Sequence, residues 1–481
     1  MGNPLAPVLP NPFPGVVYPP LPTGLPQWDT IVRLLKLATS GGTVGTLAGL
    51  PFVTLSPTSG TPPNNGATYG PDTPGTTTNG WAEAVASGKP IVLLPGTFTV
   101  PTTISLTGAM IEGLHAATIQ GSASGSYPVP AGFSVGALFA ANGNVHVHGC
   151  AFSSAGIATV NAVNQTAAFL TIDECPSELR YEISAPSGAA SDTPSCQARI
   201  TRCRFTTGGG IWYTINGAVA ATNLCNAWIE ENSQDSTSTV ALIEPDPVLA
   251  ANASNLALLG MWVARNRVAG PAFTGNAIIN LAGTAFAPAT AGSILQGAGG
   301  GDGNCQIVGN QITVTSKPVV GVIWVASGPG NTADVVDNEI GASAGGGANL
   351  VVLGSGALGI AGGGGSTIRG NVLWGQGPGG FGTLNTGTCI AIVGGTINLL
   401  TIVNNTIIGG EYGITFFPGS STLTVGYAII IRGNRLDKQS VDSILIQIEN
   451  VSYNVIGEIQ IIDNYIQNPN WAKSGTAAFI T

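Results

Sequence analysis

The residues best suited to chemistry gather in one stretch of the chain. Ten of the 24 acidic residues lie between positions 173 and 246. A glycoside hydrolase needs two carboxyl groups about 5–10 Å apart, one of which protonates the leaving group. Solvated or ion-paired carboxylates are the alternative interpretation of the same residues. The candidate catalytic residues are Glu230 or Glu231 with Asp235, and Asp173 with Glu174.

The same stretch and the residues after it combine arginine with tryptophan. Guanidinium groups bind carboxylates, so this combination is suited to an anionic glycan. A ladder of surface ion pairs, or a strip that docks another subunit, is the alternative. The glycan-binding candidates are Arg202, Arg204, Trp212, Trp228, Arg265 and Arg267.

Histidine and cysteine are scarce. The three histidines, His115, His146 and His148, do not form a motif with metal-ligand spacing, so we expect no metal ion and no cofactor. A disulfide between Cys175 and Cys196 would close a 20-residue loop in an oxidising setting. The alternative for cysteine is a pair of reduced, buried neighbours, Cys150 and Cys203.

A six-residue repeat must position these side chains. It reads aliphatic, two variable residues, Asn, one variable residue, aliphatic, and from Asn310 onward its Asn residues lie 28, 33, 34, 29 and 30 positions apart. Such a period predicts stacked coils of short strands. We expect the Asn to point inward, to adopt the left-handed backbone conformation at a turn, and to form a ladder between coils. The ladder residues are Cys150, Cys203, Asn232, Asn266, Asn310, Asn338, Asn371, Asn405, Asn434 and Asn464.

Residues that flank the ladder should stack in the same way. The expected outward columns are Arg202 with Glu231 and Arg265, and Arg204 with Ser233 and Arg267. Alternating charges in such a column stabilise a protein little per pair. We therefore expect these columns to form a strip on the protein surface, either as a ladder of ion pairs or as a binding site for a glycan or another subunit.

Composition narrows the function classes. The chain has 481 residues, a net charge of −9 and only 8% charged residues, and it carries no basic cluster, which excludes nucleic acid as a partner. No apolar run approaches the roughly 18 residues of a membrane span. The N-terminus does not read as a signal peptide. Scarce charge with abundant small polar residues is typical of an extracellular or virion surface.

The chain divides into three parts. Residues 1–40 are expected to form a Pro-rich arm with a short amphipathic helix, and residues 41–79 a linker. Residues 80–481 hold the repeat, with loop excursions at 172–198 and 281–304. We expect the arm to bind other copies of the chain or a particle shell protein.

The start of the repeat region carries a resemblance. Trp81–Val85 predicts a helix, which is followed by Gly88-Lys89-Pro90, an apolar strand and Pro95-Gly96-Thr97-Phe98. This order resembles the first coil of the pectin-lyase-like superfamily, especially phage tailspikes and related surface proteins. The resemblance covers about residue 78 to the C-terminus and implies an all-β, right-handed, single-stranded parallel β-helix of about twelve coils.

Enzymes of that superfamily carry signatures that this chain does not match. Polygalacturonase-like members have paired Asp, His-Gly and Arg-x-Lys motifs, whereas His148-Gly149 here lies inside a repeat copy without those partners. The acidic Ca²⁺ cluster of pectate lyases has no counterpart beyond the short Asp302-Gly303-Asn304. We therefore favour a non-enzymatic structural or attachment protein of a virion or cell surface, with surface polysaccharide as a ligand. The alternative is a polysaccharide-degrading, tailspike-like hydrolase or lyase.

Overall fold

The structure is a computed structural model that describes most of residues 51–467. Within that range it leaves out 131–132, 158, 186–195, 216–224, 247–260, 271–274, 276, 282–303, 316–320, 326–331, 343–349, 354–364, 376–387, 394, 411, 418–422, 438, 440–441, 447–453 and 456. The described residues, apart from Pro51, belong to a unit that runs from Phe52 to Thr481. The expected N-terminal arm, its helix and most of the excursion at 281–304 lie outside the described residues.

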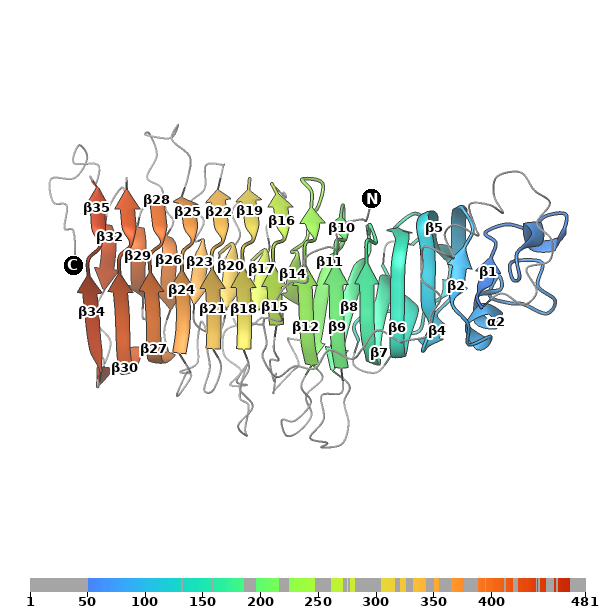
Figure 1. The fold of residues 1–481 in the computed structure, drawn as a ribbon, viewed down its shortest axis with the longest axis horizontal. Helices are drawn as coiled ribbons and strands as arrows, with labels where there is room; N and C mark the ends of the chain where they lie inside the picture. The colour runs from blue at the N-terminus through green and yellow to red at the C-terminus, as the bar shows by residue number, and fades with distance from the viewer. Residues whose placement is uncertain are drawn as a thin grey trace, which may run out of the picture. The chain divides into compact units, whose positions relative to one another are not determined.

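The repeat folds as a stack of coils, each built from short strands that pair in parallel with the equivalent strands of the next coil (Figure 1). The first row of strands leads into the repeat residue of each coil. It consists of β5 (Met110–Ser126), β6 (Ala137–Ser153), β7 (Asn161–Asp173), β9 (Cys196–Thr201), β12 (Cys225–Glu230), β15 (Met261–Ala264), β18 (Asn304–Val308), β21 (Thr332–Val336), β24 (Gly365–Arg369), β27 (Gly395–Val403), β30 (Leu423–Arg432) and β34 (Glu458–Ile462).

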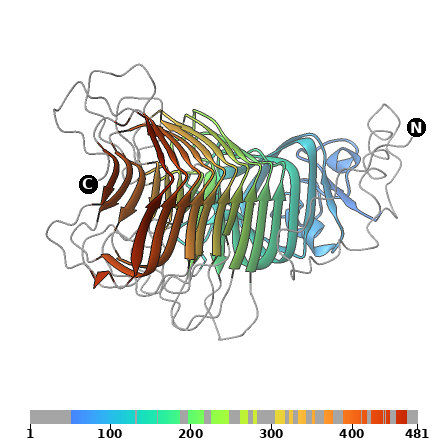
Figure 2. The same ribbon diagram turned by 60° about the vertical axis from the view of Figure 1, so that its left-hand side comes forward.

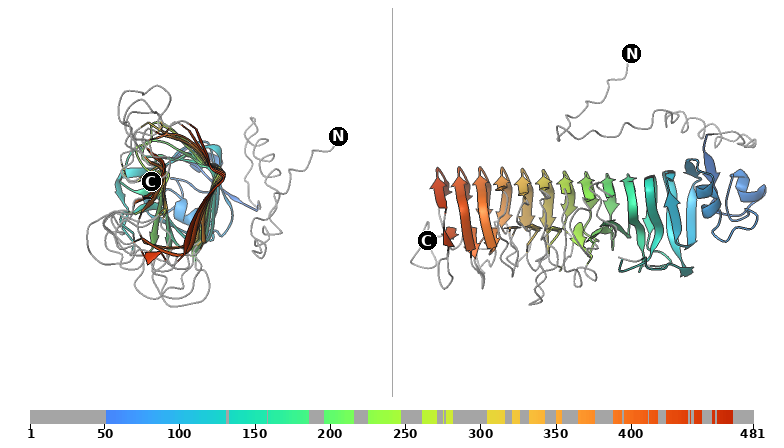
Figure 3. Two further views of the ribbon diagram at one scale, coloured as in Figure 1. Left: turned by 90° about the vertical axis from the view of Figure 1, so that its left-hand side faces the viewer. Right: turned by 90° about the horizontal axis from the view of Figure 1, so that it is seen from below.

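Two further rows complete the coils. The second row follows the repeat residue and is a separate nine-stranded sheet of β10 (Arg204–Phe205), β13 (Ser233–Gln234), β16 (Arg267–Ala269), β19 (Gln311–Val314), β22 (Glu339–Ala342), β25 (Val372–Gly375), β28 (Thr406–Gly409), β31 (Arg435–Asp437) and β35 (Tyr465–Gln467). The third row contains β8 (Arg180–Ala185), β11 (Gly210–Ile215), β14 (Ile243–Pro245), β17 (Ile279–Leu281), β20 (Ile323–Val325), β23 (Val351–Leu353), β26 (Thr388–Val393), β29 (Tyr412–Phe417) and β32 (Asp442–Ile446). Seen along the stack, the rows surround a common interior (Figure 3).

The N-terminal coils are less regular. Here α2 (Trp81–Ala86) precedes β2 (Ile91–Leu93), β3 (Gly96–Thr102) and β4 (Ile104–Thr107), which pair with β5 and β6. An earlier strand, β1 (Val53–Leu55), pairs in parallel with β2. This strand lies inside the segment that was predicted to be a linker. Its residues Val53 and Leu55 are buried in the core of the first coil.

The turn between the first and second rows has the same backbone in coil after coil. The residue before the ladder residue has a φ between 53° and 57° at Glu174, Arg202, Glu231, Arg265, Asp337, Asn404 and Asp463, and four other coils place glycine there. The left-handed position is therefore the residue before the Asn, which corrects the expectation that the Asn itself adopts this conformation. At this point the chain passes from the first-row strand to the second-row strand of the same coil, and a single residue in the left-handed conformation changes the direction of the backbone.

The Asn side chains stack inside the turn. Asn232 Nδ2 donates to Asn266 Oδ1 at 3.0 Å, and the same bond repeats at 2.9 Å from Asn266 through Asn464. Each Nδ2 also donates to a main-chain oxygen of the preceding coil, as Asn310 does to Val263. The ladder satisfies polar groups that would otherwise be buried without partners.

Cysteines continue the ladder towards the N-terminus. Cys150, Cys175 and Cys203 are all at most 1% exposed, and the Cys203 N–H donates to Asn232 Oδ1 at 2.9 Å. Cys175 is a free thiol, which corrects the expected disulfide to Cys196. Its hydrogen bond with Cys150, together with burial, raises the pKa of Cys150 well above its usual value. Cys175 therefore belongs to the interior of the coil and does not close a loop.

The core is a set of stacked apolar columns. In the first row, Val147, Ile172, Ile200 and the equivalent residues of later coils as far as Ile431 are fully buried and in register, and Ile461 in the last coil is partly buried. In the N-terminal coils the rings of Phe139, Phe152, Tyr181 and Phe205 form an edge-to-face series with centroids 5.6 to 6.2 Å apart. No coil could bury these faces alone, so stacking provides the core.

Together, the parallel rows, the repeated turn and the internal ladder define a right-handed parallel β-helix. Figure 2 shows successive coils lying side by side along the stack. No helix in the described part of the chain is long and apolar enough to cross a membrane.

Candidate functional site

All three histidines of the chain lie together at the turn of the N-terminal coils. The rings of His115 and His148 have centroids 5.4 Å apart, and His146 stacks on His148 at 6.3 Å. His115 comes from β5, whereas the other two come from β6, on the next coil. Because 33 residues separate His115 from His148 in the sequence, only the stacking of coils brings them together.

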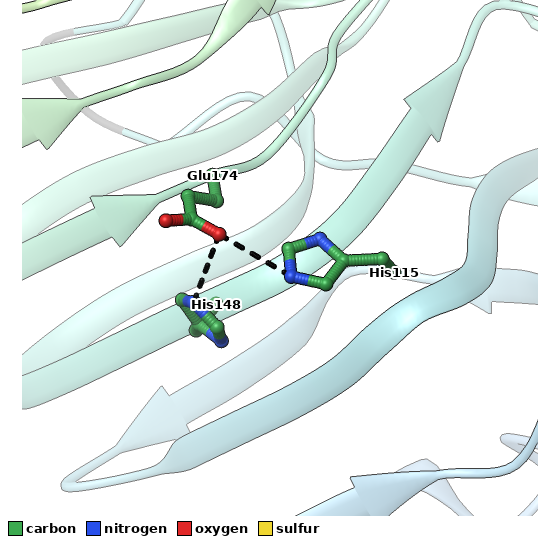
Figure 4. Close-up of side chains that lie close together, drawn as sticks. All are labelled: His115, His148 and Glu174. Atoms are coloured by element: carbon green, nitrogen blue, oxygen red, sulfur yellow. Dashed lines mark ion pairs between the residues drawn. The ribbon is translucent and has the colours of Figure 1, made fainter. Parts of the chain in front are cut away.

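Glu174 joins two of these histidines. Its Oε2 lies 3.3 Å from His115 Nε2 and 3.6 Å from His148 Nε2 (Figure 4). The nearest donor atoms of His115, His148 and Glu174 all lie within 4.8 Å of one another. We call these three residues the His–Glu cluster. No metal ligands were expected from the sequence, yet these side chains are the ones in the described part of the chain that could hold a metal ion.

A buried carboxylate holds His148 in place. Glu112 Oε2 lies 2.7 Å from His148 Nδ1, and Glu112 Oε1 accepts the N–H of Leu114 at 2.8 Å. Both oxygens of this almost completely buried group are thus used. The hydrogen bond to Glu112 raises the pKa of His148, whereas burial, followed by the charge of His148, lowers the pKa of His146.

A bulge in β5 brings His115 to the cluster. Glu112 pairs with His148 and Ala117 pairs with Cys150, so four residues of β5 lie opposite the single residue Gly149. Leu114 and His115 have positive φ values of 50° and 57° within this bulge. A Cβ on Gly149 would lie 3.4 Å from His115 Cε1 and 3.2 Å from Glu112 Oε1. Glycine therefore leaves the space that the imidazole needs.

Arg202 and Asp173 form the other side of the site. Arg202 Nη1 lies 3.1 Å from Glu174 Oε1, and its Nε donates to Asp173 Oδ1 at 2.9 Å, with a second ion pair to Asp173 Oδ2. Burial alone would raise the pKa of Asp173, but hydrogen bonds from Arg202 and Thr201 lower it. The Arg202 contacts leave Glu174 Oε2 directed at the two histidines.

Further along the first row, outward side chains form a strip of aromatic and charged groups. Thr171, Arg199, Trp228, Trp262 and Gln306 occupy equivalent positions on successive strands. Trp228 and Trp262 are half-buried between fully buried neighbours on their own strands. We call Arg199, Trp228 and Trp262 the tryptophan strip. The two tryptophans stand on adjacent strands, whose backbones are about 4.8 Å apart.

The candidate catalytic acids are held by arginines. Glu230 lies 3.5 Å from Arg199 and 3.6 Å from Arg265, and Glu231 Oε1 accepts a hydrogen bond from Arg265 Nε at 3.1 Å. Asp235 is on the second-row side, where burial would raise its pKa but bonds from Thr237 and Arg204 lower it. The structure thus brings Glu230 and Glu231 together beside the tryptophan strip and separates Asp235 from them.

The glycan-binding candidates divide among the three rows. Arg202 and Arg265 lie in the turn column that follows the first row, and Arg265 pairs with Glu231 as the repeat predicts. Arg204, Ser233 and Arg267 are in register on the second row. Trp212 is on β11 in the third row, only 8% exposed, with the Arg180 guanidinium 3.8 Å above its ring. It does not share a face with Trp228.

The parallel rows of strands and the repeated left-handed turn identify the fold. The fold is a right-handed parallel β-helix. No family model and no curated protein matches the sequence.

Among solved structures, this β-helix is similar to proteins with different activities. They include the catalytic unit of a GH87 α-1,3-glucanase from Streptomyces thermodiastaticus (12% identity, 91% of this chain and 72% of that chain, TM-score 0.42). Another is PfbA, a surface adhesin of Streptococcus pneumoniae (10% identity, 85% and 95%, TM-score 0.43). A third is tailspike protein 3 of bacteriophage CBA120 (13% identity, 92% and 68%, TM-score 0.43).

Glu112 and the His–Glu cluster were not predicted from the sequence. The copy Ile172-Asp173-Glu174-Cys175 has Cys at the ladder position, as its neighbours at Cys150 and Cys203 do. Ser177 stands at the position of the usual second aliphatic residue, so the copy escapes a search for the repeat. Aligning the three cysteines would have placed Glu174 beside Gly149 and Arg202.

Proposed function

We propose that this chain is a carbohydrate-binding attachment protein of a virion or cell surface, and that the tryptophan strip is its sugar-binding face. The observation that carries the proposal is the register of Trp228 with Trp262 on adjacent coils, beside Arg199. Sugar rings present apolar C–H faces that pack on aromatic rings, and two tryptophans on adjacent strands can each contact a sugar unit of one chain.

The charges around the strip support polar recognition. Arg199 is 56% exposed, although it pairs with Glu230, and Arg265 is 44% exposed. Exposed ion pairs contribute little stability, so these groups can exchange partners with sugar hydroxyl or carboxylate groups at low cost. The N-terminal residues 1–40, outside the described part of the chain, are proposed to attach the protein to a particle or to other copies.

Binding to a panel of neutral and acidic polysaccharides, measured by calorimetry, tests the proposal. We expect at least one polysaccharide to bind, and Trp228→Ala and Trp262→Ala each to weaken that binding about tenfold. Trp374→Ala is the matched control, because Trp374 is 45% exposed but lies on β25 in the second row. Absence of binding, or equal binding by all three variants, contradicts the proposal.

The same panel separates attachment from degradation. The protein is incubated with each polysaccharide, and new reducing ends and unsaturated products are measured. We expect neither product. Products that disappear in Glu230→Gln or Glu231→Gln would replace the attachment function with a polysaccharide hydrolase or lyase.

A further inference from the structure

We propose that His115, His148 and Glu174 bind a divalent transition-metal ion of the Zn²⁺ class. The donor set of two imidazole nitrogens and one carboxylate oxygen is one that Zn²⁺ prefers. It is drawn from three successive coils, at β5, β6 and the end of β7. This inference is independent of the proposed carbohydrate binding.

Two of the three distances between the ligand atoms are close to those of a tetrahedral zinc site. With metal–ligand bonds of about 2.0–2.1 Å, ligand atoms of a tetrahedral zinc site lie about 3.3 Å apart. The observed separations are 3.3 Å from Glu174 Oε2 to His115 Nε2 and 3.6 Å from Glu174 Oε2 to His148 Nε2. The two imidazole donor atoms lie within 4.8 Å of each other, so an ion between the three atoms requires the imidazole rings to adjust to the tetrahedral spacing.

Neighbouring groups orient each ligand. Glu112 accepts the Nδ1 hydrogen of His148, which directs the Nε2 lone pair towards the cluster, as carboxylates commonly do behind zinc-bound histidines. Arg202 occupies Glu174 Oε1 at 3.1 Å and leaves Oε2 for the metal. The bulge of β5 and the absence of a side chain at Gly149 give His115 its place.

The charges also suit a dication. Glu112, Asp173 and Glu174 carry three negative charges against the one positive charge of Arg202, which leaves two negative charges when the histidines are neutral. A divalent cation would neutralise them. His115 is 58% exposed, so the fourth position of the metal faces solvent and can hold water or an oxygen of a bound molecule.

Zinc binding is measured by calorimetry on the full chain without a histidine tag, after treatment with EDTA. We expect one Zn²⁺ per chain. His148→Ala and Glu174→Gln should weaken binding at least about 100-fold, and Glu112→Gln, which changes the support of His148 without removing a ligand, about 10- to 100-fold. His146→Ala is the matched control, because its ring stacks on His148 but it belongs to no ligand set; it should bind as the unmodified protein does.

A further variant and a spectroscopic probe test the same ligand set. His115→Ala removes an exposed ligand and should leave the thermal unfolding of the metal-free protein unchanged while abolishing tight binding. Co²⁺ added as a probe should give the visible spectrum of tetrahedral coordination. Stoichiometric Zn²⁺ binding by the His115→Ala/His148→Ala double variant, no tight binding by the unmodified chain, or an octahedral Co²⁺ spectrum would overturn the proposal.

Discussion

His148 and Glu112 face each other on adjacent strands, with Nδ1 of His148 2.7 Å from Oε2 of Glu112. The carboxylate is almost completely buried, although it lies only three residues from the exposed His115. Buried carboxylates persist where their oxygens are used, and both oxygens of Glu112 are. The pair connects the fold of the β5 bulge to the surface site.

Replacing Glu112 should therefore destabilise the protein. Glu112→Ala leaves the Leu114 N–H and His148 without their acceptor, and we expect a loss of about 1–3 kcal/mol in the free energy of unfolding. Urea denaturation followed by tryptophan fluorescence measures the loss. His115→Ala serves as the control, since its exposed ring should cost little; equal stability of the two variants would mean that Glu112 does not organise the bulge.

Removal of one Asn from the ladder should lower the free energy of unfolding. Asn338 Oδ1 accepts both the N–H and the Nδ2 hydrogen of Asn310, and Asn338 Nδ2 donates to Ile307. Asn338→Ala leaves these buried groups without partners, so we expect a loss of at least about 2 kcal/mol. The adjacent exposed Glu339, changed to Ala, should shift the urea midpoint only slightly. A small effect of Asn338→Ala would show that the ladder adds no stability.

The left-handed turn position should reject a β-branched residue for backbone reasons alone. Gly309 has φ +65°, and a Cβ added there would meet nothing closer than Arg265 Cγ at 3.7 Å. We expect Gly309→Val to lower the unfolding free energy by about 1–2 kcal/mol. Gly341→Val is the control, since its backbone is that of a strand and the space is open. Thermal unfolding of both variants measures the difference. A Gly341→Val variant less stable than Gly309→Val would contradict the role of the left-handed turn.

Glu178 should make stability depend on pH. The Ser154 N–H donates to its carboxylate at 2.8 Å, and this bond, with those from the Ser153 and Ser154 hydroxyls, lowers its pKa despite burial. A folded-state pKa below the unfolded value of about 4.3 means that ionised Glu178 stabilises above that pH, and the contribution disappears as the pH falls through the folded pKa. Glu178→Gln should thus be less stable than the unmodified protein at pH 7.

The difference should shrink as the pH falls from about 5 to 3. Melting temperatures of both proteins across that range provide the measurement. Glu339→Gln, which changes an exposed carboxylate on β22, controls for general charge effects. A stability difference that stays constant, or that grows at low pH, would contradict the role of Glu178.

The sequence determined the architecture because the ladder imposes its own period. Each Asn bonds to the Asn of the next coil, so the motif must return once per coil, and residues such as Asn310 and Asn338 are recognisable without coordinates. The neighbouring columns follow from the same register, which places Arg204, Ser233 and Arg267 in line. The chain itself thus predicts the stack and its outward strips.

Only the tertiary structure decided the site. The His–Glu cluster depends on the β5 bulge, which inserts residues opposite Gly149 and shifts His115 into line with Glu174. The intervals from His115 to His148 and from His148 to Glu174 differ, and Cys175 lacks the flanking pattern of the other ladder residues. The contact between side chains on different coils is set by where the coils bulge and bend, and that is a property of packing between coils, not of any one repeat.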